Sequence, residues 1–415
     1  MPNFVRIGFF LALRQIRRAS KWTTLLITFV MTLTFLNLVV VSGILVGLIQ
    51  GAVDANKMYY TSDIIISKLE KKDYIEQSPK VISIVKSFPE VAGMSARYIE
   101  GGRLEAGYKS KVKDTDTNEA ASSFTGIDPV AEDSVTNLSK FIIEGEYLEP
   151  TDYDQVLVGA YLLKQYFPVE SPGFSTLTDV SVGDKIRVTV GGLSREVTIK
   201  GIVKTKVDEI SMRVFFNDWQ LRELLKRTDY NVDEISIKLK PGADPILVRD
   251  GLIQAGVGAY ARVQTFEDAQ PKFLKDIKAT FALLGNMISS IGLVVASITI
   301  FIVIFINAIT RRKFIGIMKG IGISGKSIET SYVFQSTFYA VIGSAIGLAV
   351  LYGFLQPYIT AHPINFPFSD GILVAPITET MLRILLLVVT TVIAGYIPAR
   401  MIVRKNTLDS ILGRN

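Results

Sequence analysis

The sequence predicts an α-helical membrane protein with four transmembrane helices and a large α+β extracytoplasmic domain inserted between helices 1 and 2. A helix of about 20 apolar residues crosses the roughly 30 Å of hydrocarbon in a bilayer. The long segment 54–278 instead carries 30 basic and 35 acidic residues, which is typical of a water-soluble domain. Four stretches hold no Asp, Glu, Lys or Arg at all: residues 22–53, 279–310, 330–369 and 384–399.

The basic excess of the chain lies in short segments beside the apolar runs. Residues 1–21 carry five Lys or Arg and no acid, residues 311–329 five against one acid, and residues 400–415 four against one. This distribution follows the positive-inside rule and places both termini and the 311–329 segment in the cytoplasm. It argues against a nucleic-acid partner. Since the chain has no cysteine and many large apolar residues, it is neither a disulfide scaffold nor a disordered chain.

The N-terminal part combines a basic segment with the first span. In a helix over residues 1–21, all five basic residues fall on one arc, with three apolar residues close to it. The basic residues are Arg6, Arg14, Arg17, Arg18 and Lys21, and the apolar ones are Phe9, Phe10 and Leu13. The arc indicates either an interfacial helix or a plain topology signal. Residues 22–53 are expected to form the first transmembrane helix with a stalk beyond it. At 1.5 Å per residue this run extends about 48 Å, more than a bilayer requires.

The extracytoplasmic domain is expected over residues 54–272. Alternating apolar residues on either side of Gly191-Gly192 predict a hairpin with a two-residue turn. A further strand is predicted at Ile235, Ile237 and Leu239. Asp218 is interpreted as the cap of one helix, and the Asp244-Pro245 pair as the start of another.

The C-terminal half alternates apolar spans with short polar segments. Residues 273–310 are expected to form a stalk and the second span, and 311–329 a cytoplasmic loop. The third span, 330–356, should stop at Gln356-Pro357, because proline cannot continue the hydrogen-bond ladder. An outer loop (357–376), the fourth span (377–402) and a cytoplasmic tail (403–415) complete the chain.

Glycines recur at four-residue spacing in two spans. Such spacing allows close approach of helices, either within one bundle or at a seam between two subunits. Both readings stay open from the sequence. The residues concerned are Gly43, Gly47 and Gly51 in the first span and Gly343 and Gly347 in the third.

The string Gly320 to Ser327 matches the P-loop pattern G-x-x-x-x-G-K-S. A functional P-loop requires a buried strand before the glycines and a large α/β domain around them. Here the string lies in a short loop between two spans, so we expect no nucleotide binding. We also expect no catalytic or metal site, because the chain has a single histidine, His362.

The 311–328 segment, RRKFIGIMKGIGISGKSI, resembles the cytoplasmic loop of the FtsX-like permease family, which includes macrolide-exporter (MacB), lipoprotein-releasing (LolC/LolE) and cell-division FtsX proteins. Phe314 stands where the family usually has an acidic residue. Segments 142–167 and 394–412 also resemble stretches of this family, so the likeness covers essentially the whole chain. The matching loop residues are Arg311, Arg312, Ile315, Gly316, Lys319, Gly322 and Ser324.

The resemblance implies a permease subunit of an ABC exporter or extractor in the bacterial cytoplasmic membrane. ATP and Mg would then be held by a separate ATPase dimer, with no cofactor in this chain. A second permease chain, the lipid bilayer, and an extracytoplasmic adaptor or hydrolase are the other implied partners. The alternative is a signalling subunit that activates a cell-wall hydrolase without transport. The coupling loop is expected to present an apolar face to the ATPase, formed by Ile315, Ile317, Met318 and Ile321, with Arg311, Arg312 and Lys319 at its rim.

Overall fold

The computed structural model describes residues 3–109, 118–167, 175–270, 272–366 and 369–404. The chain divides into two compact units. The helical unit comprises Met1–Gln50, Asp276–Asn365 and Asp370–Asn415, and the strand-rich unit comprises Gly51–Lys275 and Phe366–Ser369. Most of the expected cytoplasmic tail, from residue 405 onward, lies outside the described residues.

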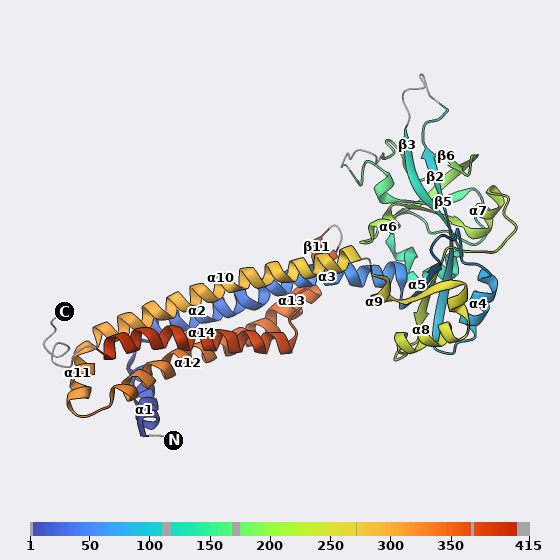
Figure 1. Ribbon diagram of the computed structural model, residues 1–415. Coiled ribbons are helices and arrows are strands. Elements are labelled where there is room, and N and C mark those ends of the chain that lie inside the picture. The colour runs from blue at the N-terminus through green and yellow to red at the C-terminus, as the bar shows by residue number, and fades with distance from the viewer. Residues whose placement is uncertain (1–2, 110–117, 168–174, 271, 367–368, 405–415) are drawn as a thin grey trace. The chain divides into compact units, whose positions relative to one another are not determined.

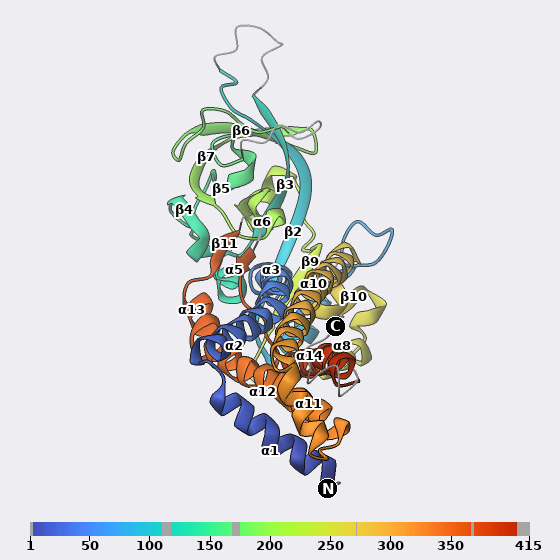
Figure 2. The ribbon, with the colours of Figure 1, turned by 90° about the vertical axis from the view of Figure 1, so that its left-hand side faces the viewer.

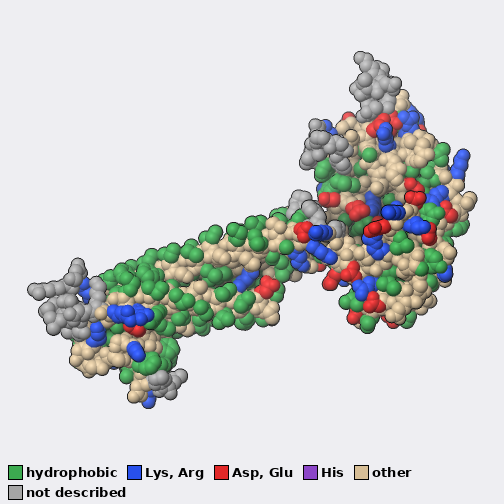
Figure 3. Space-filling model, viewed as in Figure 1, with side chains coloured by type: hydrophobic (Ala, Val, Ile, Leu, Met, Phe, Trp, Pro, Cys, Tyr) green, Lys and Arg blue, Asp and Glu red, His purple; other side chains and the backbone are tan. Residues whose placement is uncertain are grey.

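Four helices in the described residues are long and apolar enough to cross a membrane, as the sequence predicts. They run side by side in the helical unit (Figures 1 and 2). On the face shown in Figure 3, hydrophobic side chains cover most of their length, and Lys and Arg gather at the end with α1 and α11. The four are Lys21–Thr61, Lys275–Thr310, Gly325–Ala361 and Ile377–Val403.

The helical unit is built from long α-helices interrupted by short π-helical segments. A π-helical turn adds one residue to the helix and changes which carbonyls are bonded. Two such segments lie in this unit, one in the first span and one in the third. The elements are α1 (Asn3–Arg18), α2 (Lys21–Leu36), η1 (Asn37–Val41), α3 (Ser42–Asn56), α10 (Lys272–Thr310), α11 (Arg312–Gly320), α12 (Gly325–Val350), η6 (Leu351–Leu355), α13 (Gln356–Ala361) and α14 (Ile377–Val403).

The third helix does not stop at Pro357, contrary to the sequence-based expectation. The chain stays helical through η6 and α13, and Pro357 occupies the first turn of α13. A proline is tolerated there because its missing N–H would have no partner at a helix start. The π-helical turn before it resets the hydrogen-bond ladder.

Glycines let α2 and α12 approach closely. A Cβ at Gly343 would lie 2.4 Å from Cβ of Met31, and one at Gly347 would lie 2.2 Å from the Phe35 ring. A Cβ at Gly47 of α3 would lie 1.8 Å from the carbonyl oxygen of Ile372. The four-residue glycine spacing therefore serves packing within the chain at these positions.

The strand-rich unit contains a ten-stranded sheet in the order β10-β1-β9-β2-β3-β8-β5-β7-β4, with β6 paired to β2 and β7. Its strands are β1 (Ile64–Lys68), β2 (Val91–Glu105), β3 (Glu119–Ile127), β4 (Ile142–Gly145), β5 (Gln155–Gly159), β6 (Lys185–Val190), β7 (Leu193–Val203), β8 (Arg213–Asn217), β9 (Glu234–Leu239) and β10 (Ala261–Thr265). A separate pair, β11 (Ile364–Phe366) and β12 (Ser369–Gly371), lies in the loop before α14.

Strand β2 connects two hydrophobic cores. Its first half pairs with β9, and its second half pairs with β3 and β6. One core packs β1, β9 and β10 against helices α4 (Ser78–Lys86) and α8 (Pro245–Gln254). The other packs β3, β5, β6, β7 and β8 with α7 (Asp218–Leu224). Since one strand belongs to both cores, a displacement of β2 reaches both halves of the unit.

Three local predictions are confirmed in this unit. Gly191 and Gly192 have φ of 57° and 80° and form the two-residue turn between β6 and β7. The strand at Ile235 to Leu239 is β9. Asp244 caps α8 by accepting a hydrogen bond from the backbone N–H of Ile246 at 2.8 Å.

The interpretation of Asp218 as a helix cap is wrong. Helix α7 begins there, but Asn217 occupies the cap position and makes no capping hydrogen bond with its side chain. The Asp218 carboxylate instead accepts two hydrogen bonds from Arg222 Nε, each 2.9 Å long. An arginine one turn later competes successfully for the carboxylate because the pair is charge-assisted.

Candidate coupling surface

The 311–329 segment forms helix α11, a turn and the start of α12. Arg311 and Arg312 are half-buried at the beginning of α11. Ile315 and Gly316 are buried, and Ile315 belongs to the hydrophobic core of the helical unit. Met318 is half-buried against the same core. Ile315 therefore faces its own bundle, contrary to the expectation that it contacts a partner, and Met318 lies partly against the same bundle.

The exposed apolar face of α11 consists of Phe314, Ile317 and Ile321. Their exposed fractions are 67, 50 and 73%. Positions i, i+3 and i+7 lie on one side of a helix, so these three side chains form a continuous apolar strip. Phe314 was not expected in this set, because the sequence alone indicated only that it replaces a usual acidic residue.

Lys319 connects α11 to α14. Its Nζ donates a hydrogen bond of 3.0 Å to the carbonyl of Val403, the last residue of α14. Carbonyls at a helix C-terminus carry partial negative charge and attract cations. Lys319 is therefore half-buried and held to α14 within the helical unit.

The turn after α11 is made by glycine and a serine cap. Gly322 has φ of 94°, a conformation that glycine adopts without strain. Ser324 caps α12, and its Oγ accepts a hydrogen bond of 3.2 Å from the backbone N–H of Ser327. Helix α11, not a strand, precedes this turn, so the Gly320–Ser327 string lacks the surroundings of a nucleotide-binding loop.

A buried charge cluster lies in the strand-rich unit, at the end of the first long helix. That helix finishes in the π-helical segment η2 (Lys57–Thr61). The ring of Tyr60 lies against two guanidinium groups, with 5.1 Å from its centroid to Arg97 and 5.0 Å to Arg213. Its hydroxyl donates a hydrogen bond of 2.7 Å to Glu234.

Arg97 is the best-paired member of this cluster and is fully buried. Its Nε and Nη2 donate to the two carboxylate oxygens of Glu132 at 2.9 and 2.7 Å. Its Nη2 also donates to the backbone carbonyl of Tyr60 at 3.0 Å. Glu132 lies on α5 (Pro129–Thr136), and Arg97 on β2. The cluster therefore fastens the end of the first helix to the strand shared by both cores.

Pairing controls the titration of Glu132. Burial alone would raise the pKa of this carboxyl, but the Arg97 charge and hydrogen bonds from Arg97, Ser95 and Thr136 hold the pKa below its usual value. The sequence offered no signal for this cluster, because its members are separated by up to 174 positions and follow no motif.

A second polar contact joins α14 to the first span. Arg383 donates hydrogen bonds of 2.6 Å to the carbonyl of Leu38 and 2.7 Å to Oγ of Ser42. Ser289 of α10 donates to the same Leu38 carbonyl at 3.0 Å. Leu38 lies in the π-helical segment η1, where an altered ladder leaves a carbonyl for side-chain donors. Glu379, one turn earlier in α14, lies 4.0 Å from the same guanidinium group.

No group of three or more potential ligands suited to a metal ion occurs among the described residues.

Two family models match the chain. The MacB-like periplasmic core domain covers residues 24–255, more than half of the chain, and the FtsX-like permease C-terminal domain covers residues 286–407. The chain belongs to the MacB and FtsX-like family of ABC transporter permeases. The boundary between the two matches falls near α10, which returns the chain from the strand-rich unit to the bundle.

Curated relatives of this permease are distant. An uncharacterised ABC transporter permease of Mycobacterium tuberculosis is 24% identical over 62% of the chain, and one of Methanocaldococcus jannaschii is 23% identical over 66%. The macrolide export ATP-binding/permease protein MacB of Campylobacter fetus is 23% identical over 44%. The matched regions span 27, 65 and 28% of these three relatives.

Two solved structures similar to part of the permease are domains that lie outside the membrane. The periplasmic region of MacB from Actinobacillus actinomycetemcomitans is 12% identical, with a TM-score of 0.37, covering 52% of this chain and 94% of that one. The extracellular domain of the transporter YknZ from Gram-positive bacteria is 13% identical, with a TM-score of 0.32, covering 49% and 99%.

Proposed function

We propose that this permease couples ATP hydrolysis by a separate ATPase subunit to movement of its strand-rich unit, and so exports or extracts a substrate. The observation that carries the proposal is the exposed strip Phe314, Ile317 and Ile321, on a short helix between two spans. Exposed aromatic and aliphatic side chains on a helix suit insertion into a groove of another protein. Basic Lys313 and Lys326 are also exposed nearby and would meet acidic groups of that partner.

The path of transmission follows chain connections and hydrogen bonds. Helix α10 ends at Thr310, directly before α11, and Lys319 holds α11 to the end of α14. Arg383 then holds α14 to the first span, whose far end is fixed by the Tyr60 cluster. A push on α11 would therefore reach β2 through contiguous helices. This mechanism requires no continuous pore and leaves the substrate class, a drug, peptide, lipid or lipoprotein, open.

A two-chain permease is part of the proposal. ABC ATPases act in pairs, and α11 is the only segment between spans that we assign to the ATPase side. Two permease chains then give symmetric engagement. Purification of the tagged chain in mild detergent should retain a distinct ABC ATPase chain in equal copy number, while the chain alone should bind no ATP. Retention of a cell-wall hydrolase instead, without any transport of amphiphiles by the reconstituted complex, would favour the signalling function.

Orientation can be tested with single cysteines, because the chain has none of its own. Ser87 and Lys326 are exposed in the strand-rich unit and at the start of α12. In intact cells, Ser87→Cys should react with a membrane-impermeant maleimide, whereas Lys326→Cys should react only after permeabilisation. The opposite pattern of labelling would show that the strand-rich unit is cytoplasmic and would end the proposal.

A further inference from the structure

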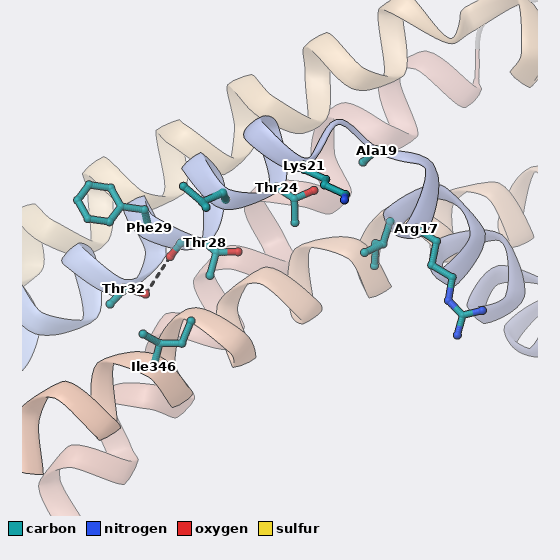
Figure 4. A pocket seen from close by; sticks show the side chains of 10 residues that line it. Arg17, Ala19, Lys21, Thr24, Thr28, Phe29, Thr32 and Ile346 are labelled. Carbon is teal, nitrogen blue, oxygen red and sulfur yellow. Dashed lines mark hydrogen bonds between the residues drawn. The ribbon is translucent and has the colours of Figure 1, made fainter. Parts of the chain in front are cut away.

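A cavity of about 620 Å³ opens in the helical unit beside the junction of α1 and α2 (Figure 4). Its volume lies within the range of about 300–1,000 Å³ usual for ligand pockets. Arg17 and Lys21 lie at the α1 end, and Thr24, Thr28 and Thr32 follow one another along α2. The lining thus changes from charged at one end to largely apolar at the other.

The two cations of this cavity lack a neutralising partner. Arg17 and Lys21 are both exposed, and within the described part of the chain neither forms an ion pair or a hydrogen bond through its side chain. No Asp or Glu occurs before Asp54 in the sequence. The mouth of the cavity is therefore a site of positive charge that suits an anion.

The part of the cavity along α2 is suited to hydrocarbon. Leu25, Phe29 and Ile346 line it and are 61, 54 and 44% exposed. Thr32 does not require a polar ligand, because its hydroxyl is already hydrogen-bonded within the bundle. It donates to the backbone carbonyls of Thr28 and Gly343, at 2.9 and 3.2 Å. A ligand that fits this gradient has a negative headgroup and an acyl chain.

We propose that this cavity binds an anionic glycerophospholipid, with its phosphate beside Arg17 and Lys21 and one acyl chain along Leu25 and Phe29. Basic pockets between helices at a membrane surface attract such headgroups. The amphipathic helix α1 also exposes Phe9 and Phe10, which are available to the bilayer. With the proposed orientation, the lipid belongs to the cytoplasmic leaflet.

A second copy of the chain suits this surface less well. In a two-fold contact centred on this patch, Arg17 and Lys21 would lie near the same two cations of the copy. Like charges in close contact are unfavourable unless an anion lies between them. A lipid phosphate instead neutralises Arg17 and Lys21 and brings no further cations to the surface.

The test uses the full chain in a neutral detergent, with phosphatidylglycerol and phosphatidylcholine that carry identical acyl chains. Native mass spectrometry should show phosphatidylglycerol retained at least about tenfold better by the wild type. Arg17→Gln with Lys21→Gln should abolish most of this preference. Arg6→Gln with Arg14→Gln removes the same charge from α1 outside the cavity and should change the preference by less than about twofold.

A steric variant tests whether the lipid binds in the cavity itself or is only attracted by the basic charge of the surface. Thr28→Phe adds an aromatic ring to the wall and should lower retention of both lipids without altering charge. The proposal is overturned if the Arg17 and Lys21 double variant retains phosphatidylglycerol like the wild type, if the Arg6 and Arg14 control loses it equally, or if Thr28→Phe has no effect. Conversion of a dimer to a monomer by the cavity variants, with lipid retention unchanged, would assign the surface to a contact between copies.

Discussion

Replacing Glu132 by alanine should destabilise the strand-rich unit by about 3–5 kcal/mol, the usual cost of leaving one partner of a buried ion pair alone. Arg97 would remain fully buried with no carboxylate on Nε or Nη2. Its remaining partners, the Tyr60 carbonyl and the more distant Glu234, are too few to balance the charge. The expected result is a large fall in the melting temperature of the purified chain and faster proteolysis of residues in the strand-rich unit.

The matched control is Glu76→Ala, which breaks an exposed ion pair with Lys72 at 2.7 Å. Exposed pairs contribute little because water screens both charges. The control should leave the melting temperature nearly unchanged. Equal effects of the two substitutions would contradict the assignment of Arg97 and Glu132 as the fastening point of the first helix.

The same pair predicts a dependence on pH. Because the pKa of Glu132 is lower in the folded chain than in the unfolded chain, its stabilisation is complete above the unfolded value of about 4.3. The stabilisation is lost as the pH falls through the folded pKa. Glu132→Gln should therefore flatten the acid limb of the stability profile, as followed by thermal unfolding at a series of pH values.

Aspartate at both Phe314 and Ile317 should abolish binding of the ATPase to the permease. Both side chains are at least half exposed, so the substitutions should leave the fold of the helical unit intact. Truncation or charging of a central apolar contact costs about 2 kcal/mol or more, which is roughly a 30-fold loss of affinity per position. Co-purification and a titration of the complex in detergent measure the change.

Two other variants separate binding from folding. Leu247→Asp makes the same chemical change at an apolar residue of α8 that is 71% exposed, and should leave ATPase binding unchanged. Ile315→Asp places a charge in the core of the helical unit and should lower the yield of folded chain. Binding retained by the Phe314 and Ile317 double variant would show that the ATPase contacts another surface.

The sequence was sufficient for features that depend on composition or on a few neighbouring residues. The four spans follow from stretches without charge, and the turn at Gly191-Gly192 follows from the backbone freedom of glycine. The cap at Asp244 can be predicted from the Asp244-Pro245 pair alone, because proline is favoured in the first turn of a helix. Each of these features is determined by neighbouring residues or by contact of the chain with the lipid bilayer.

Features set by tertiary neighbours could not be predicted. In α11 the residues Ile315, Ile317 and Met318 are all apolar, so composition does not tell which of them faces the bundle. Core packing settles this by burying Ile315 and half-burying Met318. Arg97 gave no signal because its partner Glu132 is 35 positions away, on a different element. The sequence predicts a helix end at Pro357, because it does not show the π-helical turn before this residue.

The central claim is that ATP hydrolysis in the separate subunit is transmitted through α11 and the first span to β2, and so shifts the two hydrophobic cores that share this strand. Ser87→Cys and Ser194→Cys, spin-labelled together, place one probe beside each of the two hydrophobic cores that share β2. In the reconstituted complex with the ATPase, ATP should shift the distance distribution between the labels, and the Phe314 and Ile317 double variant should show no shift. An unchanged distribution in the wild-type complex, or a full shift in the double variant, would contradict the account.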